Sequence, residues 1–167
     1  MTVIFLSCNG SKDLTDWGIP EIEEDRILSN RDLKYIIETI KTEKFKTYKQ
    51  KQYIPKSVSK LLNIWYGDKV RFASNGDEYR KGCVVTNRKI PSREITTILK
   101  SETYFVMTYN HGGRAFHRHI LFAELVNDKI AKTIWIGNAF RTLETKDDII
   151  FELECERNYL HTNIVCY

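Results

Sequence analysis

Two histidines separated by one residue, His117 and His119, are the side chains of this sequence best suited to chemistry. On a β-strand, side chains two residues apart point to the same face, so these two imidazoles would lie next to each other. Imidazoles combined with a carboxylate bind divalent transition metals, and Glu124 follows a short distance along the chain. His161 is a further candidate ligand if the fold brings it close. The spacing therefore raises the hypothesis of a metal site made from His117, His119 and Glu124.

The residues around the pair give one argument for a metal site and also allow an alternative without a metal. The His-x-His step followed by a carboxylate is similar to half of the metal motif of cupins, which would imply a metal-dependent enzyme. The other half of that motif is absent, and no glycine follows Glu124 at the expected distance. The alternative is an exposed hairpin face on which the two histidines lie beside Arg114 and Arg118.

Other catalytic signatures are missing from the chain. The sequence contains no Walker A loop, no dinucleotide-binding G-x-G-x-x-G, no G-x-S-x-G and no H-E-x-x-H. We therefore expect a protein that is not an enzyme and has no cofactor, with the metal-dependent enzyme as the alternative.

The charge of the chain is unevenly distributed. The net charge is +4, but residues 41–100 carry fifteen Lys and Arg against five Asp and Glu, whereas residues 1–40 carry four against eight. Residues 141–167 are also acidic, with three basic and six acidic side chains. A basic centre between acidic ends is typical of a protein that binds a polyanion. The alternatives are a solvated lysine-rich surface and an acidic face for a basic protein partner.

Aromatic residues alternate with lysines in the basic centre. Phe45, Tyr48 and Tyr53 lie among the lysines, and in nucleic-acid-binding proteins lysines neutralise phosphates while aromatic rings stack on bases. A second basic group extends from Arg80 to Arg93. The candidate nucleic-acid-binding residues are Lys44, Lys46, Lys49, Lys51, Lys56, Lys60, Lys69, Arg71, Arg80, Lys81, Arg88 and Lys89.

Residues 54–72 predict a strand, a short helix and a second strand. Proline is tolerated in the first turn of a helix, so Pro55 indicates a helix start. Val58, Leu61 and Leu62 follow at spacings that place them on one helical face, and Asn63 is the expected stop. A Gly-Asp turn then leads into a strand in which apolar residues alternate with Lys69 and Arg71.

This pattern resembles the DNA-binding unit of AbrB-like proteins over residues 45–90. The shared steps are Ile54-Pro55, the leucine-containing helix and Gly67-Asp68-Lys69-Val70-Arg71-Phe72, and Lys51 stands where that family usually carries an arginine. No Gly-Arg pair precedes the proline. The resemblance implies DNA contact by the basic residues and an interleaved dimer. A generic strand–turn–helix linker is the alternative.

The opening residues Met1 to Cys8, the length and the Lys- and Ile-rich composition look like small host-takeover proteins of T-even phages, including those that end host transcription. This resemblance implies contact with bacterial RNA polymerase and DNA in the cytoplasm of the host cell.

The remaining sequence predicts an α+β fold, mostly antiparallel β with one or two short helices, in a single compact domain over residues 1–167. Ser29 and Asp32 resemble the start of a capping box for a helix from about Asn30 to Lys41. Residues 9–28 are expected to be irregular. The expected strands are Thr2–Ser7, Thr103–Tyr109, Arg114–Leu125, Thr133–Ile136, Asp148–Cys155 and Thr162–Tyr167. Residues 110–113 are expected to form the hairpin turn after the strand that ends at Tyr109.

The cysteines and the hydropathy complete the prediction. Cys8, Cys83, Cys155 and Cys166 are widely spaced, without a C-x-x-C pair, so free thiols are expected. We find no apolar run of membrane-spanning length and no signal peptide. The sequence thus predicts a soluble, DNA-associated modulator of transcription, with a protein–protein inhibitor that does not bind nucleic acid as a further alternative.

Overall fold

A six-stranded sheet forms the centre of the computed structural model, which describes residue 27 and residues 29–66, 69–84, 87–113, 116–127 and 129–155. Neighbouring strands follow the order β1–β3–β4–β5–β6, and β2 pairs with β3 beside this path. The strands are β1 (Lys46–Tyr48), β2 (Phe72–Ala73), β3 (Arg93–Lys100), β4 (Tyr104–His111), β5 (His117–Val126) and β6 (Lys129–Ala139). The helices are α2 (Leu33–Thr42), the 3-10 turn η2 (Lys51–Tyr53), α3 (Lys56–Tyr66) and α4 (Lys146–Glu154). The predicted α+β class with a mostly antiparallel sheet is confirmed.

Strands β1 and β2 both pair with β3, on the edge that β4 leaves open. β1 runs antiparallel to the end of β3, with Lys46 opposite Lys100, whereas β2 runs parallel to its beginning, with Phe72 opposite Arg93. The chain therefore leaves this edge after β1, forms η2 and α3, and returns at β2. This path places the residues that follow α3 next to the start of β3.

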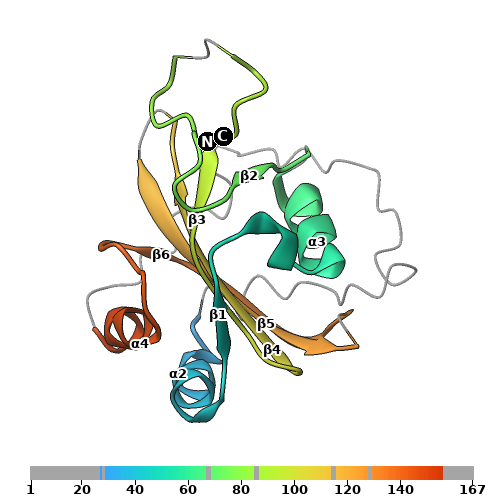
Figure 1. Ribbon diagram of the computed structural model, residues 1–167. Helices are drawn as coiled ribbons and strands as arrows, with labels where there is room; N and C mark the ends of the chain where they lie inside the picture. Colours follow the sequence, from blue (N-terminus) through green and yellow to red (C-terminus); the bar gives the residue numbers. More distant parts are fainter. Residues whose placement is uncertain are drawn as a thin grey trace, which may run out of the picture.

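Helices cover both faces of the sheet (Figure 1). α2 and α4 lie on one side, where the ring of Tyr35 meets that of Phe122 edge-on at a centroid distance of 6.5 Å. α3 lies on the other side, where the hydroxyl oxygens of Tyr66 and Tyr109 are 2.9 Å apart. Because strand side chains alternate between faces, His111 lies on the same face of β4 as Tyr109, which is the α3 face.

Helix α3 confirms the helix predicted after Pro55. Val58, Leu61 and Leu62 are fully buried on its inner face. The predicted stop at Asn63 is wrong, because the helix continues to Tyr66. The side-chain oxygen of Asn63 instead accepts a hydrogen bond of 2.7 Å from the backbone N–H of Val70, which ties the returning chain to the helix.

Helix α2 lies close to its predicted range, and its Ile36 and Ile40 are fully buried. The helix begins at Leu33, slightly later than the predicted start near Asn30. Asp32 is the N-cap residue, and its side chain makes no capping hydrogen bond.

Helix α4 replaces the strand predicted over Asp148–Cys155, so that prediction is wrong. Thr145 and Asp148 form a reciprocal capping box that starts the helix. Ile149 and Leu153, four residues apart, are buried on one face. The capping box and this spacing favour a helix over an extended strand.

The central strands differ from the prediction in number and in bounds. Strand β6 extends over Lys129–Ala139, well beyond the predicted Thr133–Ile136. Strand β3 was not predicted, although five consecutive residues from Ile95 to Leu99 are buried. Strand β4 continues through Asn110 and His111, so the predicted turn begins two residues too early.

Several predicted features lie outside the described residues, namely the strands over Thr2–Ser7 and Thr162–Tyr167, the irregular stretch before residue 27 and the Gly-Asp turn at 67–68. Cys83 and Cys155 are free thiols, whereas Cys8 and Cys166 also fall outside that range. In the part of the chain that the structure describes, no helix has both the length and the apolar character to cross a bilayer.

Candidate functional site

A pocket of about 330 Å³ lies where the chain after α3 and the loop between β2 and β3 meet the start of β3. We call it the basic pocket. Its lining residues are Lys69, Arg71, Arg80, Arg88, Ile90, Pro91, Ser92 and Arg93. Among these described residues five are cationic and none is acidic.

Backbone hydrogen bonds hold the walls of the basic pocket. The N–H of Arg80 donates to the carbonyl of Pro91 at 2.8 Å, and the N–H of Gly112 donates to the carbonyl of Ser92 at the same distance. A Cβ atom at Gly112 would lie 2.1 Å from the carbonyl oxygen of Arg80. Only glycine therefore allows the end of β4 to approach the loop this closely.

The arginines of the basic pocket are fixed in different ways. The guanidinium of Arg71 donates to the backbone carbonyls of Arg88 and Lys89. The guanidinium carbon of Arg93 lies 4.2 Å from the centre of the Tyr66 ring, a cation–π contact with α3. The Nε atoms of Arg80 and Arg93 are buried and have no hydrogen-bond partner. Buried donors without an acceptor are costly, and an anion in the pocket would satisfy them.

The structure brings together four of the twelve predicted nucleic-acid-binding residues. Lys69, Arg71, Arg80 and Arg88 line the basic pocket with Arg93. The remaining eight belong to other segments or do not line the pocket: Lys44, Lys46, Lys49, Lys51, Lys56, Lys60, Lys81 and Lys89. All of these are exposed except Lys49, which is half-buried.

The aromatic residues of the basic centre already contact other side chains. The rings of Tyr48 and Tyr53 stack on each other with centroids 3.8 Å apart. Phe45 packs against the core, and the ammonium of Lys146 lies 5.7 Å from its ring centre. These contacts leave Tyr53, which is 37 % exposed, as the most accessible of the three rings.

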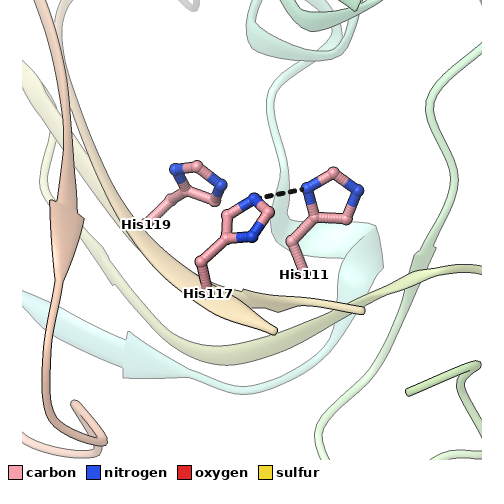
Figure 2. A group of neighbouring side chains, drawn as sticks. All are labelled: His111, His117 and His119. Carbon is pink, nitrogen blue, oxygen red and sulfur yellow. Dashed lines mark hydrogen bonds between the residues drawn. The ribbon is translucent and has the colours of Figure 1, made fainter. Parts of the chain in front are cut away.

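A cluster of three histidines lies on the α3 face of the sheet, and we call it the histidine cluster. His111 is directly opposite His117, and Tyr109 is opposite His119, so three imidazoles of two paired strands share one face. Figure 2 shows the three rings turned toward one another. One nitrogen from each ring lies within 4.8 Å of the others, and Nδ1 of His111 is 3.0 Å from Nε2 of His117. This group can hold one metal ion.

Burial controls the protonation of the histidine cluster. His111 and His119 are buried, and His117 is half-buried. Burial lowers the pKa of His111 to about 3, and the positive charge of Arg93 adds to this effect. Burial also holds the pKa of His119 well below its usual range. Both imidazoles are therefore neutral at pH 7, the form in which histidine binds metals.

Aromatic rings support the cluster and connect it to the basic pocket. The Tyr109 ring stacks on His119 at a centroid distance of 4.8 Å, and the Tyr66 ring meets His111 edge-on at 6.2 Å. Tyr66 also carries Arg93 on its ring. Arg93 thus lines the basic pocket and influences the histidine cluster.

The structure changes the ligand set predicted from the sequence. His117 and His119 lie together as expected, but Glu124 pairs with Tyr104 five residues farther along β5 and does not join them. The third member is His111, which was expected to lie in the hairpin turn. The alternating apolar residues Phe105, Met107 and Tyr109 continue in phase to His111, and that periodicity could have identified it. His161 lies outside the described residues.

Comparisons with known proteins found no matching family model, no matching curated protein and no matching solved structure.

Proposed function

We propose that this protein binds DNA through the basic pocket and modulates transcription. The observation that supports the proposal is the convergence of five cations on one pocket with no carboxylate among its described lining residues. Three separate segments of the chain supply these cations, so their proximity is a consequence of the fold.

The chemistry of the pocket favours a phosphate-bearing ligand. Like charges held close together repel one another, and a bound anion relieves that repulsion. Arginine recognises phosphate by donating two parallel hydrogen bonds. The unpartnered Nε atoms of Arg80 and Arg93 are donors of this kind.

The exposed lysines would extend the contact beyond the pocket. Lys44, Lys46 and Lys51 are exposed on and around β1, and Lys56 and Lys60 are exposed on α3. Phosphate contacts of this type provide most of the affinity of non-specific DNA binding. We therefore propose that the pocket binds one phosphate at a fixed position and that the exposed lysines attract the rest of the duplex electrostatically.

The resemblance to T-even phage proteins extends the proposal to a partner. A phage-encoded protein of this kind would shut off host transcription by contacting DNA and the bacterial RNA polymerase together. The same resemblance would imply that it acts in the host cytoplasm.

The Arg88→Glu variant tests the DNA contact, because Arg88 is exposed and lines the pocket. We expect it to weaken binding to duplexes of any sequence alike. We also expect the plot of log affinity against log salt concentration to become less steep. The magnitude of its negative slope should decrease by about 1, which corresponds to the loss of one phosphate contact. Fluorescence anisotropy of labelled duplex and of single-stranded RNA over a salt series measures both quantities.

The Lys34→Glu variant is the matched control. It reverses one side-chain charge in the same way, but on α2, in the groove between α2 and α4. This groove lies on the opposite side of the sheet from α3 (Figure 1). If the two variants lose affinity equally, the attraction is unspecific and the pocket is not the contact. Absence of duplex binding by the unaltered protein at low salt would refute the DNA proposal.

A further inference from the structure

The histidine cluster takes no part in the proposed DNA contact. Its geometry indicates a separate ligand-binding site. Its members are held by the register of the β4–β5 hairpin, in which His111 is opposite His117 and His119 is opposite Tyr109. They are therefore positioned by the backbone of two central strands and not by flexible loops. Sites on such rigid elements hold ligand geometry well.

An unsatisfied atom points to a missing partner in the cluster. Nε2 of His119 is buried and makes no hydrogen bond, although only 5 % of the residue is exposed. Buried polar atoms without a partner are rare in native proteins, and one explanation is an ion that is bound there. A metal would give this nitrogen its partner.

The distances are close to those that a metal requires. Zinc–nitrogen bonds of about 2.0–2.1 Å place the ligands of a tetrahedral ion about 3.3 Å apart. The nitrogens of the cluster lie within 4.8 Å of one another, and Nδ1 of His111 and Nε2 of His117 are already 3.0 Å apart. Small rotations of the imidazoles would therefore complete the geometry.

We propose that His111, His117 and His119 bind a divalent transition-metal ion, with zinc as the natural occupant. The ligand atoms would be Nδ1 of His111 and Nε2 of His117 and His119. Three imidazoles suit zinc, whereas calcium and magnesium prefer oxygen ligands. The described cluster supplies three ligands, which leaves a fourth position for water or an anion. The positive charges of Arg93 and Arg80 near His111 favour an anionic fourth ligand.

Metal binding by the full-length protein tests this proposal. The protein is stripped with a chelator and dialysed, and zinc is then titrated in competition with a chromophoric chelator, with elemental analysis of the product. We expect one equivalent of tightly bound zinc. Cobalt substituted for zinc should give the visible bands of a four-coordinate nitrogen site without the near-ultraviolet band of thiolate ligation, which excludes Cys83 and Cys155 as ligands.

Two variants identify the ligands. His117→Ala removes the half-buried member, whose loss disturbs packing least, and should weaken zinc binding by more than about 100-fold, beyond what the loss of an outer-shell contact costs. Glu124→Ala, which removes the ligand that the sequence predicted, should leave the affinity unchanged. Circular dichroism verifies that each variant is folded.

Several results would overturn the proposal. If the unaltered protein does not bind zinc, the proposal is rejected, whatever the variants show. His117→Ala binding zinc as tightly as the unaltered protein, or Glu124→Ala losing zinc to the same extent as His117→Ala, would reject this ligand set. The metal-site proposal does not depend on DNA binding, so a result that refutes DNA binding does not affect it.

Discussion

Gly112 is the residue at which the histidine cluster and the basic pocket come into contact through the backbone. It follows His111 directly, and its N–H donates to the carbonyl of Ser92 in the wall of the pocket. The same residue leaves room for the carbonyl of Arg80. Any side chain here would push the pocket away from the strand that carries His111.

The Gly112→Ala variant should destabilise the protein by about 1–3 kcal/mol, the usual cost of overpacking a buried position. The added Cβ would meet the Arg80 carbonyl oxygen at 2.1 Å and the Lys81 Cα at 2.7 Å, and both are backbone atoms. Chemical denaturation measures the free energy of unfolding. Gly82→Ala is the control, since nothing lies within 4 Å of its new Cβ. An unchanged stability of Gly112→Ala would show that the loop yields easily.

At the scale of elements, α4 depends on a local start signal. The Thr145 side chain accepts a hydrogen bond of 3.1 Å from the N–H of Asp148, and the Asp148 carboxylate accepts from the hydroxyl and the N–H of Thr145. The hydrogen bond from the Thr145 hydroxyl lowers the pKa of Asp148, and the backbone bonds from Thr145 and Glu144 contribute in the same direction. The charge of Asp148 therefore stabilises the folded state.

The stabilisation by Asp148 should depend on pH. Because the pKa of its carboxyl is lower in the folded than in the unfolded state, the contribution is fully present above the unfolded value of about 3.9 and is lost as pH falls through the folded pKa. We expect Asp148→Asn to be less stable than the unaltered protein at pH 7 and the difference to shrink below about pH 4. Urea denaturation at several pH values measures this difference.

Asp147→Asn provides the comparison for that experiment. It removes a carboxylate from the same first turn of α4, without the capping bonds of Asp148. Equal losses of stability in the two variants would mean that the helix dipole, and not the capping box, accounts for the effect.

At the scale of the whole molecule, the fold concentrates positive charge at one corner of the sheet. The cations of the basic pocket come from the chain after α3, from the loop between β2 and β3, and from β3 itself. They converge because β1 and β2 share one edge of β3. Contact with DNA and direct contact with RNA polymerase, the two proposed partners, can be distinguished by experiment.

Affinity purification of the tagged protein from a bacterial lysate, with and without nuclease, tests the polymerase proposal. We expect RNA polymerase to be recovered in both cases, because a direct protein contact does not require nucleic acid. Recovery only without nuclease would show that DNA bridges the two proteins and would reject direct contact. The Arg88→Glu variant should retain the polymerase after nuclease treatment if the two contacts use different surfaces.

The sequence alone determined the features that depend on neighbours along the chain. Pro55 and the spacing of Val58, Leu61 and Leu62 were sufficient for α3, since helix formation depends on local hydrogen bonds and one apolar face. The alternation within β4 and β5 was sufficient for the hairpin and for the shared face of His117 and His119. Thr145-x-x-Asp148 was also a readable signal for α4, although the apolar run after it was interpreted as a strand.

Only the tertiary structure decided which distant residues meet. His111 joins the histidine cluster because the register of β4 on β5 places it opposite His117, and one residue of slippage would turn it to the other face. Lys69, Arg80 and Arg93 meet because two strands far apart in sequence pair with the same edge of β3. The periodicity of β4 indicates which face His111 lies on, but its pairing with His117 and the shared edge of β3 depend on the hairpin turn and on the packing of the whole core.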